Sequence, residues 1–251
     1  MDYSAYLKRI NYEGDLSISL DLLKKLQYLH LLHIPFENLD IHQGVEIKME
    51  NAFSKLVEKG RGGFCYELNG AFFGLLKEIG FQVRLISGRV ANKDQDFGQE
   101  FDHMAILAEV DGDRYLADVG FGDFSAEPLK IILDTLQHDR YGDFQIEKFD
   151  SSYLIVKKLV EDTLVPGYIF TEIARIPDDF SEMCIYHQKS ENSSFTKKKI
   201  CSIATENGRI TITGERLKIR DGKDLMEKEF GEESEFHHYL WKYFNIQLSA
   251  R

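Results

Sequence analysis

Cysteine is scarce in this sequence, with three residues among 251. Cys65, Cys184 and Cys201 are odd in number, widely spaced and without a Cys-x-x-Cys pair. Disulfide frameworks and structural zinc sites depend on paired or clustered cysteines, so neither is expected, and no metal site is predicted. The reactivity of any one of these thiols therefore depends on the residues around it.

Long apolar runs are also lacking. No stretch reaches the length that crosses a bilayer. The amphipathic first ten residues do not contain the apolar core of a secretory signal. We therefore expect cytoplasmic residence and no membrane partner.

Basic residues are too few to balance the acidic ones. The chain has 31 Lys and Arg against 42 Asp and Glu, a formal net charge of -11. Nucleic acids and anionic membranes bind to basic surfaces, so neither is expected as a partner. A small anionic co-substrate could still be held by a local basic patch. The hydrophobic fraction of 43% is that of an ordinary globular protein, with one large domain or two to three smaller ones.

What the sequence does contain is a Gly-Gly-Phe-Cys stretch, with a cysteine two positions after a pair of glycines, within residues 61–70. Cys65 opens an apolar pattern at helical spacing that stops at Gly80, so it is expected in the first turn of a helix. Free N–H groups and the helix dipole at that end favour a thiolate, the reactive form of cysteine. A buried structural cysteine is the alternative.

The apolar period changes from helical to alternating at Phe81, so helices are expected before it and strands after it. Residues 103–110 and 113–120 are two strand candidates joined by an Asp-Gly pair, a strong signal for a two-residue hairpin turn. That register places His103 and Asp118 on one face as diagonal neighbours, with backbones ~7 Å apart. A three-residue loop would put them on opposite faces.

A carboxylate beside an imidazole fixes its tautomer and stabilises the imidazolium that forms when the ring takes a proton. With Cys65, the pair His103 and Asp118 would supply a nucleophile, a base and an orienting group, as in thiol acyl-transfer enzymes and hydrolases. Each residue alone has an ordinary structural alternative, and periodicity does not show that Cys65 lies near the hairpin.

The second half of the chain is less informative. Residues 134–152 are polar and are expected to form loops. Pro166-Gly167 is expected to be a turn between two short strands, and Asn207-Gly208 to be the turn of a hairpin over residues 200–212. Residues 232–244 are amphipathic and predict a closing helix.

Five segments in order resemble signatures of the arylamine N-acetyltransferases. They lie in about the first half of the chain, at residues 6–10, 34–39, 61–67, 101–104 and 116–122. Five ordered motifs are much more specific than any one of them. The resemblance implies an α+β fold with a cysteine-protease-like Cys-His-Asp arrangement. Its expected parts are an N-terminal helical bundle (residues 1–80) carrying the nucleophilic cysteine, a middle β-barrel (81–189) carrying His and Asp, and a C-terminal α/β lid (190–251).

The resemblance also implies a ping-pong acetyl transfer in which acetyl-CoA is a co-substrate and no cofactor is bound permanently. Cys65 would take the acetyl group, His103 would act as general base and Asp118 would orient it. A small aromatic amine or hydrazine would then accept the acetyl group on nitrogen. General-base assistance of this kind is typically worth ~10²–10⁴ in rate.

By the same resemblance, Phe36 and Phe121 would line the acceptor pocket, and Gly120 and Gly122 would keep backbone close to the acyl group. Ordinary core is the alternative for Phe36. A buried charge network of Arg9, Glu37 and Arg61 would support the motif, and exposure is the alternative for the arginines.

Two other functions share these residues. A related thiol amide synthase or hydrolase would use the same three side chains with a different pocket. A binding module that had kept the fold would be expected to lose at least one of them.

Overall fold

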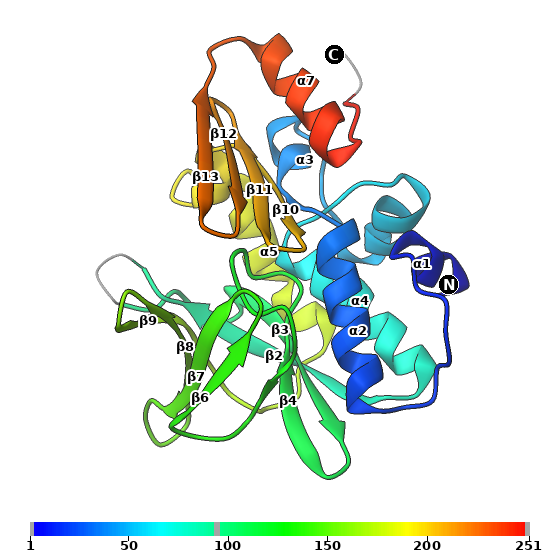
Figure 1. Cartoon of the computed structure of the whole chain (residues 1–251), viewed down its shortest axis with the longest axis vertical. Coiled ribbons are helices and arrows are strands. Elements are labelled where there is room, and N and C mark those ends of the chain that lie inside the picture. Colours follow the sequence, from blue (N-terminus) through cyan, green and yellow to red (C-terminus); the bar gives the residue numbers. More distant parts are fainter. Residues whose placement is uncertain (1–2, 93–95, 249–251) are drawn as a thin grey trace.

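The computed structural model describes residues 3–92 and 96–248 (Figure 1). Helices form one side of the molecule, an eight-stranded sheet lies next to them, and a five-stranded sheet carrying the last helix stands at one end (Figure 1). None of the helices in the described ranges is long and apolar enough to cross a membrane.

The helical part precedes residue 80 and ends with the helix that carries Cys65. Its elements are α1 (Tyr3–Arg9), α2 (Leu20–His33), β1 (Phe36–Glu37), α3 (Leu39–His42), η1 (Met49–Asn51), η2 (Ser54–Glu58) and α4 (Cys65–Ile79). In α4, Leu68, Phe72, Leu75 and Leu76 are buried on one side. The helix ends at Gly80, whose left-handed φ of 108° suits a residue without a Cβ. The prediction that Cys65 begins this helix is confirmed.

The eight-stranded sheet provides the middle of the molecule. Its strands are β2 (Gln82–Val90), β3 (His103–Val110), β4 (Asp113–Ala117), β5 (Leu129–Lys130), β6 (Thr135–Asp139), β7 (Gly142–Lys148), β8 (Leu154–Val160) and β9 (Thr163–Phe170). They run in the order β5-β4-β3-β2-β9-β8-β7-β6. Gln137 of β6 exchanges two hydrogen bonds with the backbone of Lys130 in β5, at 2.8 and 3.0 Å, so the edge strands approach one another and the sheet is nearly closed into a barrel.

The hairpin register predicted for β3 and β4 is confirmed. Val110 pairs with Asp113 and Ile106 with Ala117, on either side of the two-residue loop. Asp111 and Gly112 in the loop both have positive φ, 53° and 83°, as a turn matched to the strand twist requires.

Two expectations for the later strands are wrong. Residues 134–152 contain β6 and β7 rather than loops, with Phe144 and Ile146 fully buried on the inner face of β7. Pro166-Gly167 lies inside β9, where Gly167 is the extra residue of a bulge between the pairs Val156–Tyr168 and Lys157–Pro166. The turn before β9 is formed instead by Glu161 and Asp162, both left-handed.

The C-terminal part consists of η3 (Pro177–Phe180), α5 (Ser181–Lys189), α6 (Ser194–Lys197), β10 (Ile200–Thr205), β11 (Gly208–Thr213), β12 (Arg216–Asp221), β13 (Asp224–Glu229) and α7 (Glu233–Phe244). The closing helix predicted at residues 232–244 is confirmed. The hairpin turn is Glu206-Asn207, one residue earlier than predicted, because Gly208 already pairs with Thr205. A Cβ on Gly208 would lie 2.1 Å from the Arg220 carbonyl oxygen, so this glycine serves strand packing.

One edge of the five-stranded sheet is the short strand β1, which comes from the helical part. Phe36 pairs with Ser202 of β10 on one side and bridges to Gly63 on the other. The glycine pair that precedes Cys65 is therefore fixed to the C-terminal sheet through β1.

Candidate active site

One cavity gathers most of the residues that the sequence singled out. Its volume is about 210 Å³, and it is lined by Phe36, Cys65, Val90, Asp102, His103, Gly120, Phe121, Gly122, His187, Ser194 and Phe195. The predicted pocket residues Phe36, Phe121, Gly120 and Gly122 all lie in this lining, together with Cys65 and His103. Asp118 lies behind His103, outside the lining.

Cys65 opens α4 and is almost completely buried, with 3% of its surface exposed. The backbone that follows β4 passes directly over it. A Cβ on Gly120 would lie 2.7 Å from the Cys65 Cα and 3.1 Å from its Cβ, so only glycine permits this approach. This contact joins the first turn of α4 to the end of the hairpin, a proximity that the sequence pattern alone did not establish.

His103 and Asp118 form a buried ion pair, with Nε2 of the ring 2.6 Å from Oδ2 of the carboxylate. Burial lowers the pKa of His103, but Asp118 and the Cys65 side chain outweigh burial and raise this pKa to about 10. Burial raises the pKa of Asp118, whereas His103 and a hydrogen bond from Asn69 bring it below its usual value. With Nε2 engaged by Asp118, Nδ1 is the ring nitrogen that remains for Cys65.

The Asp118 carboxylate is held by donors on both oxygens. Oδ1 accepts from the Asn69 amide and from the Gly120 N–H, each at 2.8 Å, and Oδ2 accepts from the Tyr168 hydroxyl at 2.8 Å. Asn69 follows Cys65 by one helical turn, so the spacing within α4 already placed it on the same face. Tyr168 comes from β9, and no local pattern indicated its contact with Asp118.

The two glycines before Cys65 are required by the chain's own packing rather than by an approaching ligand. A Cβ on Gly62 would lie 2.0 Å from the Pro35 carbonyl oxygen, and one on Gly63 would lie 2.7 Å from the Glu67 Cβ. The Gly63 carbonyl accepts the Glu37 N–H at 2.8 Å, which is how β1 is attached here.

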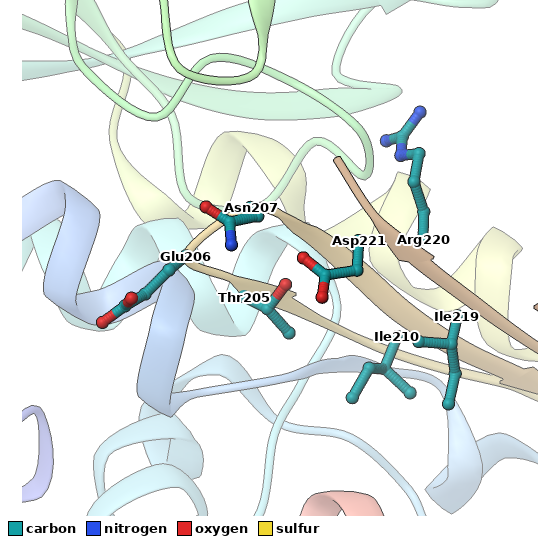
Figure 2. Close-up of a pocket in the computed structure, with 7 residues that line it drawn as sticks. All are labelled: Thr205, Glu206, Asn207, Ile210, Ile219, Arg220 and Asp221. Carbon is teal, nitrogen blue, oxygen red and sulfur yellow. The ribbon is translucent and has the colours of Figure 1, made fainter. Parts of the chain in front are cut away.

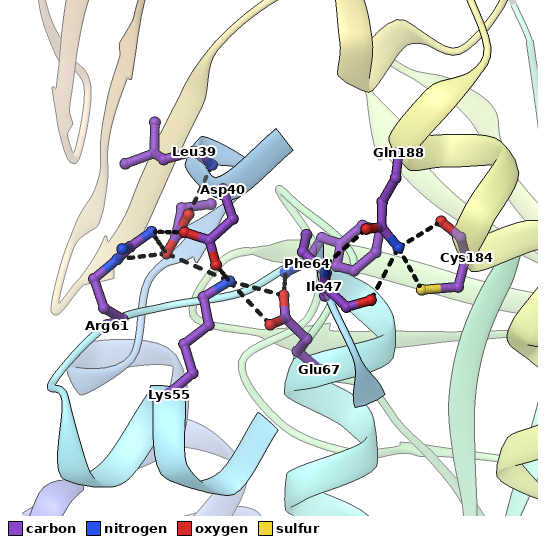
Figure 3. A network of polar contacts seen from close by, with 10 residues as sticks. Leu39, Asp40, Ile47, Lys55, Arg61, Phe64, Glu67, Cys184 and Gln188 are labelled. Atoms are coloured by element: carbon purple, nitrogen blue, oxygen red, sulfur yellow. Dashed lines mark hydrogen bonds and ion pairs between the residues drawn. The ribbon is translucent and has the colours of Figure 1, made fainter. Parts of the chain in front are cut away.

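A buried charge network supports the start of α4 (Figure 3). Arg61 contacts Glu37 at 2.7 Å and Asp40 at 2.8 Å. Lys55 contacts Asp40 at 2.8 Å and Glu67 at 2.9 Å. The pairing of Glu37 with Arg61 was expected.

The expected place of Arg9 in this network is wrong. Its guanidinium donates to the backbone carbonyls of Leu56 and Gly60, at 3.2 and 3.4 Å. Lys55 takes the second cationic position instead. No local pattern indicated this, because the lysine lies in η2, twelve residues before its partner Glu67.

Glu67 connects this network to the nucleophile's helix. Its Oε2 accepts the Phe64 N–H at 3.2 Å, at the residue that caps α4. Burial raises the pKa of Glu67 to about 7 despite the neighbouring Lys55. The network therefore fixes the helix end through a carboxylate that changes its charge near neutral pH.

A second hollow, of about 370 Å³, lies at the tip of the C-terminal sheet between the ends of β10, β11 and β12 (Figure 2). Its seven lining residues include no thiol or imidazole, and Arg220 extends away from it to Asp123, 2.8 Å away. Within the described ranges, no cluster of three or more His, Cys, Asp or Glu side chains could hold a metal ion.

Comparison with known proteins assigns the class. The N-acetyltransferase family profile matches residues 19–251. Arylamine N-acetyltransferase 1 of Bos taurus is 29% identical over 279 residues, spanning 100% of this chain and 96% of the bovine one. The fold and these matches define an acyltransferase.

Solved structures agree over the whole fold. The Mycobacterium marinum arylamine N-acetyltransferase in complex with CoA has a TM-score of 0.90 at 28% identity, over 98% of this chain and 93% of that one. An enzyme from Bacillus cereus, described as having a unique Cys-His-Glu catalytic triad, has a TM-score of 0.90 at 26% identity, over 99% and 100%. This chain belongs to the arylamine N-acetyltransferase family, and its expected α+β fold is confirmed.

Proposed function

We propose that this protein transfers an acetyl group from acetyl-CoA to the nitrogen of an arylamine or arylhydrazine, through an acetyl-Cys65 intermediate. The observation that carries the proposal is the arrangement of a thiol, an imidazole and a buried carboxylate at a cavity with aromatic walls. The relatives named above are arylamine N-acetyltransferases, and one was solved with CoA, which supports both substrates.

In the first half of the reaction, His103 takes the proton from Cys65 and the thiolate attacks the thioester carbonyl. The bond to the CoA sulfur breaks, and CoA leaves as a thiol with that proton. In the second half, the amine nitrogen attacks the acetyl-Cys65 carbonyl and gives a proton to His103, which returns it to the Cys65 thiolate. The high pKa of His103 suits the first half of the reaction, because the imidazolium stays charged beside the thiolate.

Asp118 would hold the imidazole in position and stabilise its positive charge. In the Bacillus cereus enzyme a glutamate is described in the triad, whereas this chain has the shorter Asp118, held by the Asn69 amide and the Tyr168 hydroxyl. A carboxylate held on both sides has a fixed direction toward His103.

The cavity fits one aromatic ring. Cavities of ~150 Å³ admit benzene, and this one measures about 210 Å³. Phe36, Phe121 and Phe195 provide apolar faces, and the Phe121 ring lies edge-on to His103 at 5.2 Å. Gly120 and Gly122 leave backbone exposed beside the reacting carbon.

Each of the three proposed segments contributes different residues to the site. Residues 1–80 supply Cys65, residues 81–189 supply His103 and Asp118, and residues 190–251 form a lid to which Phe195 belongs. The attachment of β1 to β10 would keep the lid in register with the motif before Cys65.

Two-substrate kinetics test the proposal. Varying acetyl-CoA at several arylamine concentrations is expected to give parallel double-reciprocal lines, because CoA leaves before the amine reacts. Cys65→Ala and His103→Ala are expected to lose turnover while remaining folded, whereas Cys201→Ala, in a core outside the cavity, is expected to retain it.

Intersecting lines would contradict the covalent route. Release of CoA and acetate without an amine would favour the thiol hydrolase, and acetyl-CoA-independent ring closure onto an amine would favour the amide synthase. Unchanged turnover in His103→Ala would remove His103 from the mechanism.

A further inference from the structure

A second histidine–carboxylate pair lies at the same cavity, apart from His103 and Asp118. Nε2 of His187, in α5, is 3.0 Å from Oδ1 of Asp102, the residue directly before β3. Both residues line the cavity. Nothing in the acetyl-transfer steps above uses either of them.

The surroundings fix what each member of this pair can do. Nδ1 of His187 is 3.1 Å from the Ser193 hydroxyl, whose oxygen also accepts the Phe195 N–H at 3.2 Å. The hydroxyl hydrogen is thus available to Nδ1. Nε2 is buried and makes no hydrogen bond, and its closest approach to Asp102 is the 3.0 Å contact with Oδ1. His187 packs between the rings of Tyr66 and Phe195.

Asp102 is the member that faces the cavity. Its side chain is 16% exposed, whereas that of His187 is 8% exposed and its Nε2 is buried. Oδ2 accepts the Val90 N–H at 3.2 Å, which leaves acceptor capacity on the carboxylate for a ligand.

The cavity offers the Asp102 carboxylate no lysine or arginine as a counterpart. Among its lining residues, all of which the structure describes, Asp102 is the one carboxylate and there is no lysine or arginine. His103 is already paired with Asp118. An acceptor with a carboxylate on its ring would meet the like charge of Asp102 with no lysine or arginine in the lining to offset the repulsion.

We propose that Asp102, positioned by His187, selects acceptor arylamines that carry a hydrogen-bond donor or a cationic group on the ring and disfavours those that carry a carboxylate. This inference rests on the proposed function, because it concerns the second substrate of that reaction. Asp102 is a binding residue in this account, and His187 is a positioning residue that acts through it.

Single-turnover discharge of the acetyl-enzyme tests the inference. The protein is first loaded with acetyl-CoA, freed of CoA, and mixed with 4-aminophenol, 4-methylaniline or 4-aminobenzoate. The rate constant of each amine is compared between wild type and Asp102→Asn, so that the intrinsic nucleophilicity of the amine cancels in the ratio. The rate constants refer only to enzyme that already carries the acetyl group, so they do not depend on how fast the enzyme was acetylated.

In Asp102→Asn, the rate with 4-aminobenzoate relative to 4-methylaniline is expected to rise by on the order of 10-fold, and the advantage of 4-aminophenol to shrink. His187→Gln is expected to shift the same ratios in the same direction by less. Asp113→Asn makes the same charge change at the far end of β4 and is expected to leave the ratios unchanged.

Unchanged ratios in both Asp102→Asn and His187→Gln would overturn the inference, as would the same shift in Asp113→Asn. A wild-type protein that forms no acetyl-enzyme would instead overturn the proposed function, and this inference with it. The two failures are distinguished by the loading step.

Discussion

At the scale of single residues, the chemistry proposed for Cys65 depends on how firmly His103 is held. The imidazole is buried, paired with Asp118 at 2.6 Å, and edge-on to the Phe121 ring. Asp118 in turn has Tyr168 as a donor at 2.8 Å. A base fixed in this way loses little freedom when the thiolate attacks, which is where preorganisation assists a reaction.

Tyr168→Phe should slow acetylation of Cys65 by on the order of 10-fold, because Asp118 loses a hydrogen bond and is held less firmly toward the imidazole. The acidic limb of the pH–rate profile should also move as the pKa of the pair changes. Stopped-flow release of CoA measures both quantities. Tyr141→Phe removes a hydroxyl that donates to the Thr205 carbonyl outside the cavity, and it should leave both unchanged.

The raised pKa of His103 predicts a pH-dependent stability. The folded value of about 10 exceeds the unfolded value of 6.5, so the charged ring stabilises the fold fully below pH 6.5 and this contribution is lost as the pH rises through 10. The difference in free energy of unfolding between wild type and His103→Gln should therefore shrink across this window. Urea unfolding at a series of pH values measures it, and a difference that grows with pH would contradict the assignment.

At the scale of the elements, α4 is the piece on which the site is assembled. Its first turn carries Cys65, its second carries Asn69, and its N-terminus is tied by Glu67 to the charge network of Lys55, Arg61 and their carboxylates. Loss of one member of such a buried network strongly destabilises the fold, because the remaining charges have no water to solvate them.

Lys55→Met should lower the free energy of unfolding by about 3–5 kcal/mol at neutral pH, since three buried carboxylates would then share one cation. The loss should be smaller near pH 5, because Glu67, whose pKa is already raised to about 7, takes up a proton. Chemical unfolding at both pH values measures this. Lys24→Met removes an exposed pair with Glu127 and should cost at most ~1 kcal/mol at either pH.

The elements also show where sequence patterns were sufficient. The start of α4 and the β3–β4 register followed from local signals, a glycine pair before an apolar helix and an Asp-Gly turn. The strand β7 was missed although Phe144 and Ile146 alternate with polar residues, because the surrounding composition is polar. At Pro166-Gly167, turn chemistry gave a wrong prediction because β9 continues through the proline with a bulge at Gly167.

The residues of the candidate site were likewise predictable only where they lie in sequence motifs. Motif order gave Cys65, His103, Asp118 and the pocket residues, all of which lie at or behind one cavity. The sequence did not predict the contacts of Tyr168, Lys55 and His187. Each of these residues meets its partner through tertiary packing between elements and not through spacing along the chain.

At the scale of the whole molecule, the C-terminal sheet is joined to the helical part through β1 and the residue after it. Asn38 is fully buried. Its amide donates to the carbonyls of Phe195 and Lys198, at 2.9 and 2.8 Å, and accepts the Ile200 N–H at 2.8 Å. One side chain thus fixes the segment that brings Phe195 to the cavity.

Asn38→Ala should lower the free energy of unfolding by about 2–3 kcal/mol, because buried backbone groups lose their partner. It should also speed amide hydrogen exchange in β10 more than in β3, since the sheet loosens locally. Exchange measured by mass spectrometry tests this. Arg220→Ala removes an exposed contact with Asp123 between the C-terminal sheet and the loop after β4, and it should change exchange in β10 little.

The central claim, that Cys65 carries the acetyl group, is tested most directly by mixing the protein with acetyl-CoA and no amine and mapping the mass of its peptides. We expect one acetyl group per chain, on the peptide of Cys65 and not on those of Cys184 or Cys201. It should be absent in Cys65→Ala and removed by an aromatic amine with formation of the N-acetylated product. Amine acetylation by the Cys65→Ala variant, or an acetyl group on another residue that the amine discharges, would contradict it.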